Sequence, residues 1–152
     1  MRQILIVANQ TLGGEPLLDA ARERIAQGPC EFTLVVPVLL DTGDVIATVG
    51  SELPLLGPST TYESARTEAV HRLVACIQAL SGLGATVDGD IGVQNPVEAV
   101  GHCLAAKAYD EIIVSTLPTT VSRWLHQDVP HRVQRKYGIP VTTVTARERV
   151  TT

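Results

Sequence analysis

The sequence predicts one α/β domain built on a five-stranded, parallel, doubly wound sheet with strand order 3-2-1-4-5. Short apolar runs rich in β-branched residues, which are typical of strands buried on both faces, alternate with longer segments whose apolar residues recur at helical spacing. This alternation favours right-handed crossovers and therefore parallel strands. The length of 152 residues fits a single domain, which we place at residues 1–146, with a polar tail at residues 147–152.

The first half of the chain supplies two strands, two helices and a long loop. We expect strands at residues 4–8 and 32–40, with an intervening helix that begins at Pro16, because proline suits a first helical position. The segment 41–59 is rich in glycine and proline, and loops of this length are uncommon unless they are functional or mobile. A helix at residues 60–81 follows, since its apolar residues form one stripe.

The second half supplies three strands and two helices. Asn95 and Pro96 form a typical helix start, and Asp128 is placed to cap the last helix. The expected order is a strand at 84–90, a helix at 95–107, a strand at 111–115, a helix from Asp128 to Gly138 and a strand at 139–145.

Composition and charge exclude several classes of protein. A chain that is 45% hydrophobic and 18% charged is not disordered. A net charge of −4 and an aromatic content of 3% argue against binding to nucleic acid or to a membrane surface. No apolar stretch is long enough for a signal peptide or a membrane span. The three cysteines lack close spacing, so we expect no metal site and no disulfides, and a cytoplasmic location.

The candidate site lies where ligands of open α/β sheets bind, beyond the carboxyl ends of the strands. Phosphate-loop and dinucleotide motifs are missing from the sequence. The segment after the fourth strand instead carries five hydroxyl side chains and one arginine before a helix start, a combination that suits an anion. We predict a nucleotide or anion pocket at the ends of the first and fourth strands, lined by Ala8, Asn9, Val36, Ser115, Thr116, Thr119, Thr120, Ser122, Arg123 and Asp128.

The stretch around the last expected helix is basic within an acidic chain. Arg123, Arg132, Arg135 and Lys136 stand there against Asp128 alone. A favourable interaction with the carboxyl end of the helix explains Arg135 and Lys136, so Arg123 and the hydroxyl groups remain the candidate anion ligands. No arrangement of nucleophile, base and carboxylate predicts catalysis.

These features resemble the universal stress protein family over residues 4–144. The resemblance rests on the opening strand, the long loop after the second strand, and the segments 95–100, 111–115 and 133–144. It implies the fold shared by universal stress proteins and adenine-nucleotide α-hydrolases, a role in stress response, and an adenine nucleotide such as ATP as the ligand.

The chain departs from the glycine motif with which family members bind ATP, a G-x-x-G stretch followed about nine residues later by G-[ST]. Thr116 and Thr120 stand near the first two glycine positions, and Gln127 and Asp128 replace the final pair. Asn9 replaces the usual aspartate after the first strand. Without these glycines the backbone cannot approach phosphates closely, so we expect ATP binding to be weak or absent.

Three functions stay open from the sequence. The first is a non-enzymatic universal-stress-type module whose pocket takes a nucleotide or another small anion. The second is a pure protein-interaction module with an empty pocket, and the third is a small enzyme that uses residues 41–59 as a lid. The apolar strand at 139–145 would form a sheet edge, which predicts a homodimer, as does the family resemblance.

Overall fold

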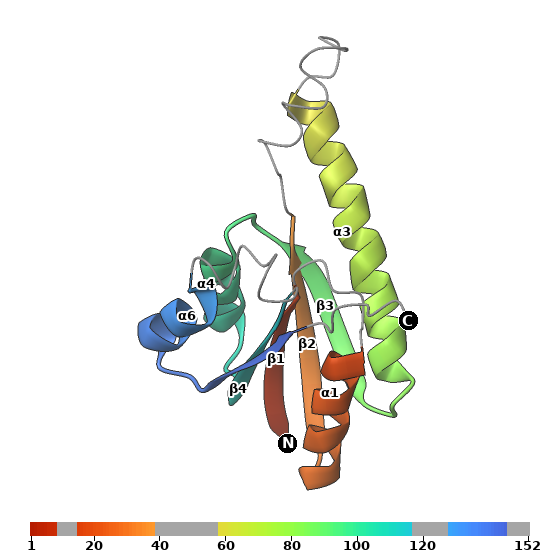
Figure 1. Ribbon diagram of the computed structural model, residues 1–152, viewed down its shortest axis with the longest axis vertical. Helices are drawn as coiled ribbons and strands as arrows, with labels where there is room; N and C mark the ends of the chain where they lie inside the picture. The colour runs from red at the N-terminus through yellow and green to blue at the C-terminus, as the bar shows by residue number, and fades with distance from the viewer. Residues whose placement is uncertain (9–14, 39–57, 117–127, 146–152) are drawn as a thin grey trace, which may run out of the picture.

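The computed structural model describes residues 1–8, 15–38, 58–116 and 128–145. Within these ranges one parallel sheet has the order β3-β2-β1-β4-β5, which confirms the predicted strand order (Figure 1). The elements are β1 (Arg2–Ala8), α1 (Glu15–Gln27), β2 (Cys30–Pro37), α3 (Pro58–Ser81), β3 (Thr86–Gly92), α4 (Pro96–Ala106), β4 (Glu111–Thr116), α6 (Val129–Tyr137) and β5 (Val141–Thr145).

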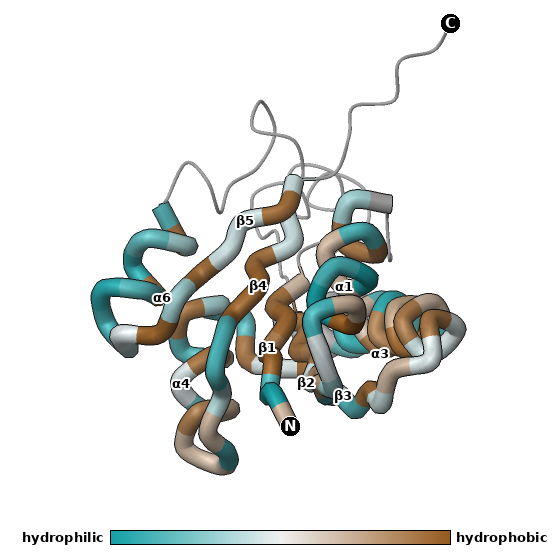
Figure 2. Tube along the Cα trace, turned by 90° about the horizontal axis from the view of Figure 1, so that it is seen from below, coloured by the Kyte–Doolittle hydropathy of each residue, from teal (hydrophilic) through white to brown (hydrophobic). Residues whose placement is uncertain are grey.

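Helices cover both faces of the sheet (Figure 2). One apolar cluster packs α1 and α3 against side chains that include Ile4, Ile6 and Phe32. A second cluster packs α4 and α6 against the other face, around Leu5 and Val7. Successive residues of β1 therefore enter opposite clusters, as expected for a strand that is buried on both faces.

Glycine and proline account for the differences between predicted and observed strand bounds. The expected strand at 84–90 begins at Thr86, because Gly84 has a φ of 89° and belongs to the preceding turn. The expected strand at 139–145 begins at Val141, after Pro140, whose carbonyl oxygen accepts a hydrogen bond from Ile112 N at 2.9 Å. The expected strand at 32–40 spans Cys30–Pro37, and positions 39 and 40 lie outside the described residues.

Two predicted helix starts have different outcomes. Asn95 caps α4 as expected, since its Oδ1 accepts hydrogen bonds from Val97 N at 2.9 Å and Glu98 N at 3.3 Å. The predicted side-chain cap by Asp128 is wrong, although Asp128 does precede α6. Its backbone is left-handed, with φ 57° and ψ 39°, whereas a capping residue is extended so that its oxygen reaches the first helical N–H groups. The Asp128 Oδ2 atom instead lies 3.1 Å from His131 Nδ1.

Candidate functional site

The centre of the sheet contains a topological switch point between β1 and β4. These strands are neighbours, but the chain leaves β1 through α1 toward β2 and leaves β4 through α6 toward β5. The helices α1 and α6 cover opposite faces (Figure 2). Ala8 and Ser115 are register partners at the carboxyl ends of β1 and β4, where such folds bind ligands.

The structure brings three of the predicted site residues onto one side of the sheet. Ala8 and Val36 are buried in the cluster beneath α1 and α3. Ser115 is also buried and has the same orientation, because Ile113, two residues earlier on β4, belongs to that cluster. Thr116 is fully buried and faces the α4 and α6 side. The two hydroxyl groups at the end of β4 therefore point to opposite faces.

The other predicted site residues are divided between the described and undescribed parts of the chain. Asp128 is exposed at the start of α6, and its carboxylate contacts His131 on the same helix. The remaining five lie outside the described residues: Asn9, Thr119, Thr120, Ser122 and Arg123. Most of the proposed loop 41–59 and the whole tail at 147–152 also lie outside them.

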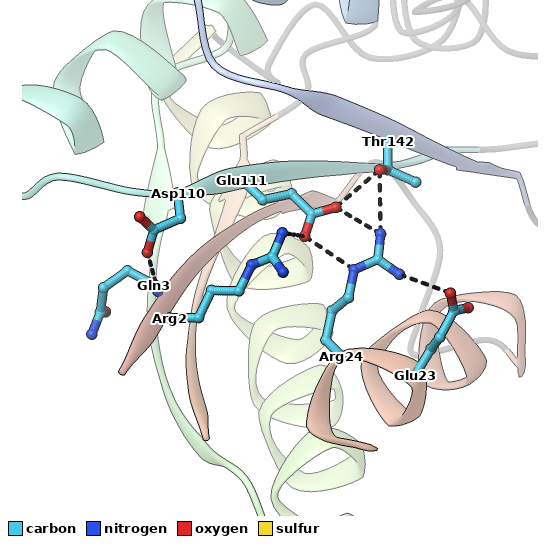
Figure 3. A network of polar contacts seen from close by, with 7 residues as sticks. All are labelled: Arg2, Gln3, Glu23, Arg24, Asp110, Glu111 and Thr142. Carbon is cyan, nitrogen blue, oxygen red and sulfur yellow. Dashed lines mark hydrogen bonds and ion pairs between the residues drawn. The ribbon is translucent and has the colours of Figure 1, made fainter. Parts of the chain in front are cut away.

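A buried polar network joins β4 to α1 at the opposite end of the strands (Figure 3). Glu111 accepts hydrogen bonds from Arg24 Nε at 3.0 Å and Arg24 Nη2 at 2.6 Å, and from Arg2 Nη2 at 3.2 Å. Thr142 Oγ1 adds a bond at 3.0 Å from β5. The hydrogen bonds from Arg24 hold the pKa of Glu111 below its ordinary value. Because this network lies at the amino ends of the strands, it stabilises packing and is distant from the switch point.

A cavity between α4 and α6 is a feature that the sequence did not predict. It has a volume of about 330 Å³ and is lined by Val97, Arg132, Arg135 and Lys136. The signal in the sequence is the i, i+3, i+4 spacing of the three cations, which places them on one face of a helix. Their position at the helix end explains Arg135 and Lys136 singly, but it does not explain why they share a face with Arg132.

Within the described ranges, no three histidine, cysteine or acidic side chains gather where they could hold a metal ion. No helix of the same ranges is long and apolar enough to cross a membrane. The cysteines at 30, 76 and 103 form no disulfide, and burial raises the pKa of Cys30 and Cys103. His71 and His102 are exposed on their helices.

Solved structures share this architecture over nearly the whole chain. Hypothetical protein MJ0577 matches with a TM-score of 0.62 at 18% identity, covering 97% of both chains. A universal stress protein family member from Burkholderia pseudomallei matches with a TM-score of 0.56 at 18% identity, covering 93% of this chain and 94% of that one. The chain has the universal stress protein fold.

A plant protein with the universal stress protein fold was solved with a nucleotide. This family member from Arabidopsis thaliana, with AMP bound, matches with a TM-score of 0.56 at 10% identity, covering 97% of this chain and 93% of that one. No protein-family model and no curated protein sequence matches the chain. The likeness to universal stress proteins is therefore one of three-dimensional fold.

Proposed function

We propose that the chain is a non-enzymatic, universal-stress-type module that binds an adenine nucleotide at the carboxyl ends of β1 and β4. The observation that carries the proposal is the pairing of Ala8 with Ser115 at the switch point. Both side chains there are small, and Ser115 carries a hydroxyl group. The AMP-bound Arabidopsis protein of the same fold supports an adenine nucleotide as the ligand class.

Several of the predicted residues have distinct tasks in this proposal. Ala8 and Val36 form the apolar floor for the base, and Ser115 hydrogen-bonds the ribose or phosphate. Arg123 binds the phosphate by charge, assisted by the hydroxyl groups of the preceding loop. The missing glycines favour a nucleotide with a single phosphate over ATP, because close backbone approach matters most for the terminal phosphates.

The module works in this proposal without catalysis. The Asp128–His131 pair is the histidine–carboxylate pair of the described residues, and both of its side chains are more than half exposed. Arg135 Nη2 lies 3.3 Å from His131 Nδ1, so the pair belongs to an exposed polar cluster on α6 that includes no nucleophile among the described residues. We place the module in the cytoplasm, where cysteines that form no disulfide stay reduced.

Calorimetry of the full chain with AMP and ATP tests the proposal. We expect AMP to bind, and Ser115→Ala to weaken it by about 0.5–1.5 kcal/mol, the usual contribution of one neutral hydrogen bond. The matched control is Ser64→Ala, because Ser64 is exposed on α3. The proposal fails if neither nucleotide binds at millimolar concentration.

We also propose that two copies of the chain pair through β5. The other outer strand, β3, is protected, since Asp88 Oδ1 accepts from Gly89 N and Asp90 Oδ1 accepts from Ile91 N, both at 2.8 Å. Successive residues of a strand point their backbone N–H and C=O groups to opposite sides. Gly92 O faces β2, since it accepts a hydrogen bond from Val38 N, so the N–H groups of Gly89 and Ile91 face away from β2. The outer strand β5 carries no charged residue between Val141 and Thr145. An uncharged outer strand favours pairing with a second copy.

A further inference from the structure

We propose that the cavity between α4 and α6 is a second anion site, which takes a small molecule bearing several phosphate groups. None of its four lining residues, Val97, Arg132, Arg135 and Lys136, belongs to the nucleotide pocket proposed between β1 and β4. The inference therefore stands independently of that function.

Three cations share the face of α6 that borders this cavity. Arg132, Arg135 and Lys136 follow i, i+3, i+4 spacing, and all three are exposed. The buried Val129 and Val133 anchor the other face of the helix. Among the described residues none of the three cations has a carboxylate partner within ion-pair distance. Within that part of the chain no carboxylate neutralises the three positive charges, which would face a ligand at the cavity.

The helix end alone does not explain this arrangement. Arg135 and Lys136 lie in the last turn of α6, where the partial negative charge of the helix favours them. Arg132 lies one turn earlier, outside that region, and its charge is repelled by the other two. The acid at the start of the helix, Asp128, contacts His131 instead of relieving this repulsion. An anionic ligand would compensate all three charges together.

Packing contacts fix α6 against α4 beside the cavity. Tyr137 Oη donates a hydrogen bond of 2.8 Å to Val97 O, which fixes the end of α6 against the start of α4. Gly101 makes room for this contact, because a Cβ atom there would lie 2.5 Å from Tyr137 Oη. The cations are therefore presented by a docked helix beside the apolar Val97, and the cavity of about 330 Å³ has the size of a small-molecule site.

These dimensions and charges favour a compact polyphosphate over a nucleic acid. A nucleic-acid surface would need an extended basic stripe, whereas this chain has a net charge of −4 and the three cations of α6 line one open surface cavity. Guanidinium groups bind phosphate oxygens in a bidentate manner, and a lysine adds a point charge. A ligand with two or more adjacent phosphate groups matches three cations on one helix face.

Calorimetry and amide NMR of the full chain with inorganic tripolyphosphate test this inference. We expect binding at low salt that weakens with ionic strength, and shifted amide signals at Val97 and along α6. Each of Arg132→Gln, Arg135→Gln and Lys136→Gln should weaken binding about tenfold, the loss expected for one charged hydrogen bond. The matched control is Arg66→Gln on α3, an exposed arginine outside the cavity, which should bind as the unaltered chain does.

Three results would overturn the inference, provided that circular dichroism shows each variant folded. The first is no binding of tripolyphosphate at millimolar concentration and low salt. The second is an equal loss of affinity in Arg66→Gln, which indicates non-specific attraction. The third is binding of a short oligonucleotide without binding of tripolyphosphate, which assigns the face to nucleic acid. Unchanged affinity in Ser115→Ala would separate this site from the nucleotide pocket.

Discussion

The guanidinium group of Arg24 lies 2.6 Å from the carboxylate of Glu111 and joins the last turn of α1 to the first residue of β4. Thr142 bonds to both partners and extends the link to β5. The side chains of Glu111 and Arg24 are only 5% and 11% exposed. Removing one charge would therefore leave the other buried without its main partner, which is more costly than losing a surface ion pair.

We predict that Glu111→Gln lowers the free energy of unfolding at pH 7 by about 3 kcal/mol, because Arg24 loses its buried counter-ion. Urea denaturation measures this difference. The matched control is Glu68→Gln, which removes an exposed i,i+4 pair with Arg72 and should cost about 0.5 kcal/mol or less. Equal losses in the two variants would contradict a special role for the buried network.

The same network predicts how stability depends on pH. The pKa of Glu111 is lowered in the folded state, chiefly by hydrogen bonds from Arg24, from an ordinary value of 4.5. The unfolded chain therefore binds this proton at higher pH than the folded chain does. The stabilisation by Glu111 is complete above pH 4.5 and is lost as the pH falls through the lower, folded pKa. The stability gap between the native chain and Glu111→Gln should narrow in acid; a gap that stays constant would contradict this account.

We predict that Gly89→Ala destabilises the fold by about 1–3 kcal/mol, the usual cost of overpacking. A Cβ atom at this position would lie 2.7 Å from Leu34 O and 2.9 Å from Leu73 Cδ1, so the backbone of β2 or β3 must shift. Thermal denaturation compares this variant with Gly82→Ala, where a Cβ atom meets its nearest neighbour at an ordinary 3.4 Å. A smaller loss of stability in Gly89→Ala than in Gly82→Ala would show that β3 does not pack this closely against Leu34 and Leu73.

We predict that Arg123→Ala weakens AMP binding by about 1.5–3 kcal/mol, the range for a charged hydrogen bond. Arg123 lies outside the described residues, and its role rests on its place in the hydroxyl-rich segment after β4. Calorimetry measures the change, with Arg66→Ala as the control for a lost exposed arginine. Unchanged affinity in Arg123→Ala would remove this residue from the site.

We predict that ATP binds weakly or not at all and is not hydrolysed. Thr120 and Gln127 replace glycines of the family motif, and the sequence has no phosphate-loop lysine for the terminal phosphates. Calorimetry and an assay of released phosphate check the two parts separately. Micromolar affinity for ATP would show that hydroxyl groups and Arg123 can replace the glycine backbone.

We predict that Thr143→Lys splits the proposed dimer. Thr143 is the exposed middle residue of β5, so a two-fold pairing would bring two like charges together. Thr86→Lys makes the same change on the outer strand β3 and should leave the dimer intact. Light scattering at micromolar concentration distinguishes these outcomes. A monomeric unaltered chain would refute the pairing itself.

Local patterns predicted the central strands because their apolar runs are complete within their own segments, and the alternation of strands with helices predicted the strand order. Residues 4–8, for example, are fully apolar, and they form the buried part of β1. The Arg24–Glu111 pair could not be predicted in this way, since its members are 87 positions apart. The sequence also could not predict the left-handed backbone of Asp128, because aspartate is a typical residue of an ordinary helix cap. The sequence also could not predict the cavity between α4 and α6, because it depends on how the two helices pack against each other.

Asp88 and Asp90 accept hydrogen bonds from the outward N–H groups of β3, and this limits how many copies of the chain can join into one sheet. If β5 strands pair about a two-fold axis, the joined sheet ends in a β3 strand on either side, and each β3 carries Asp88 and Asp90. Neither outer edge of the joined sheet then has unpaired N–H groups at these positions to which another chain could bind. Association would stop at two copies instead of extending into a fibril, even at the high protein concentrations that favour cross-β aggregation.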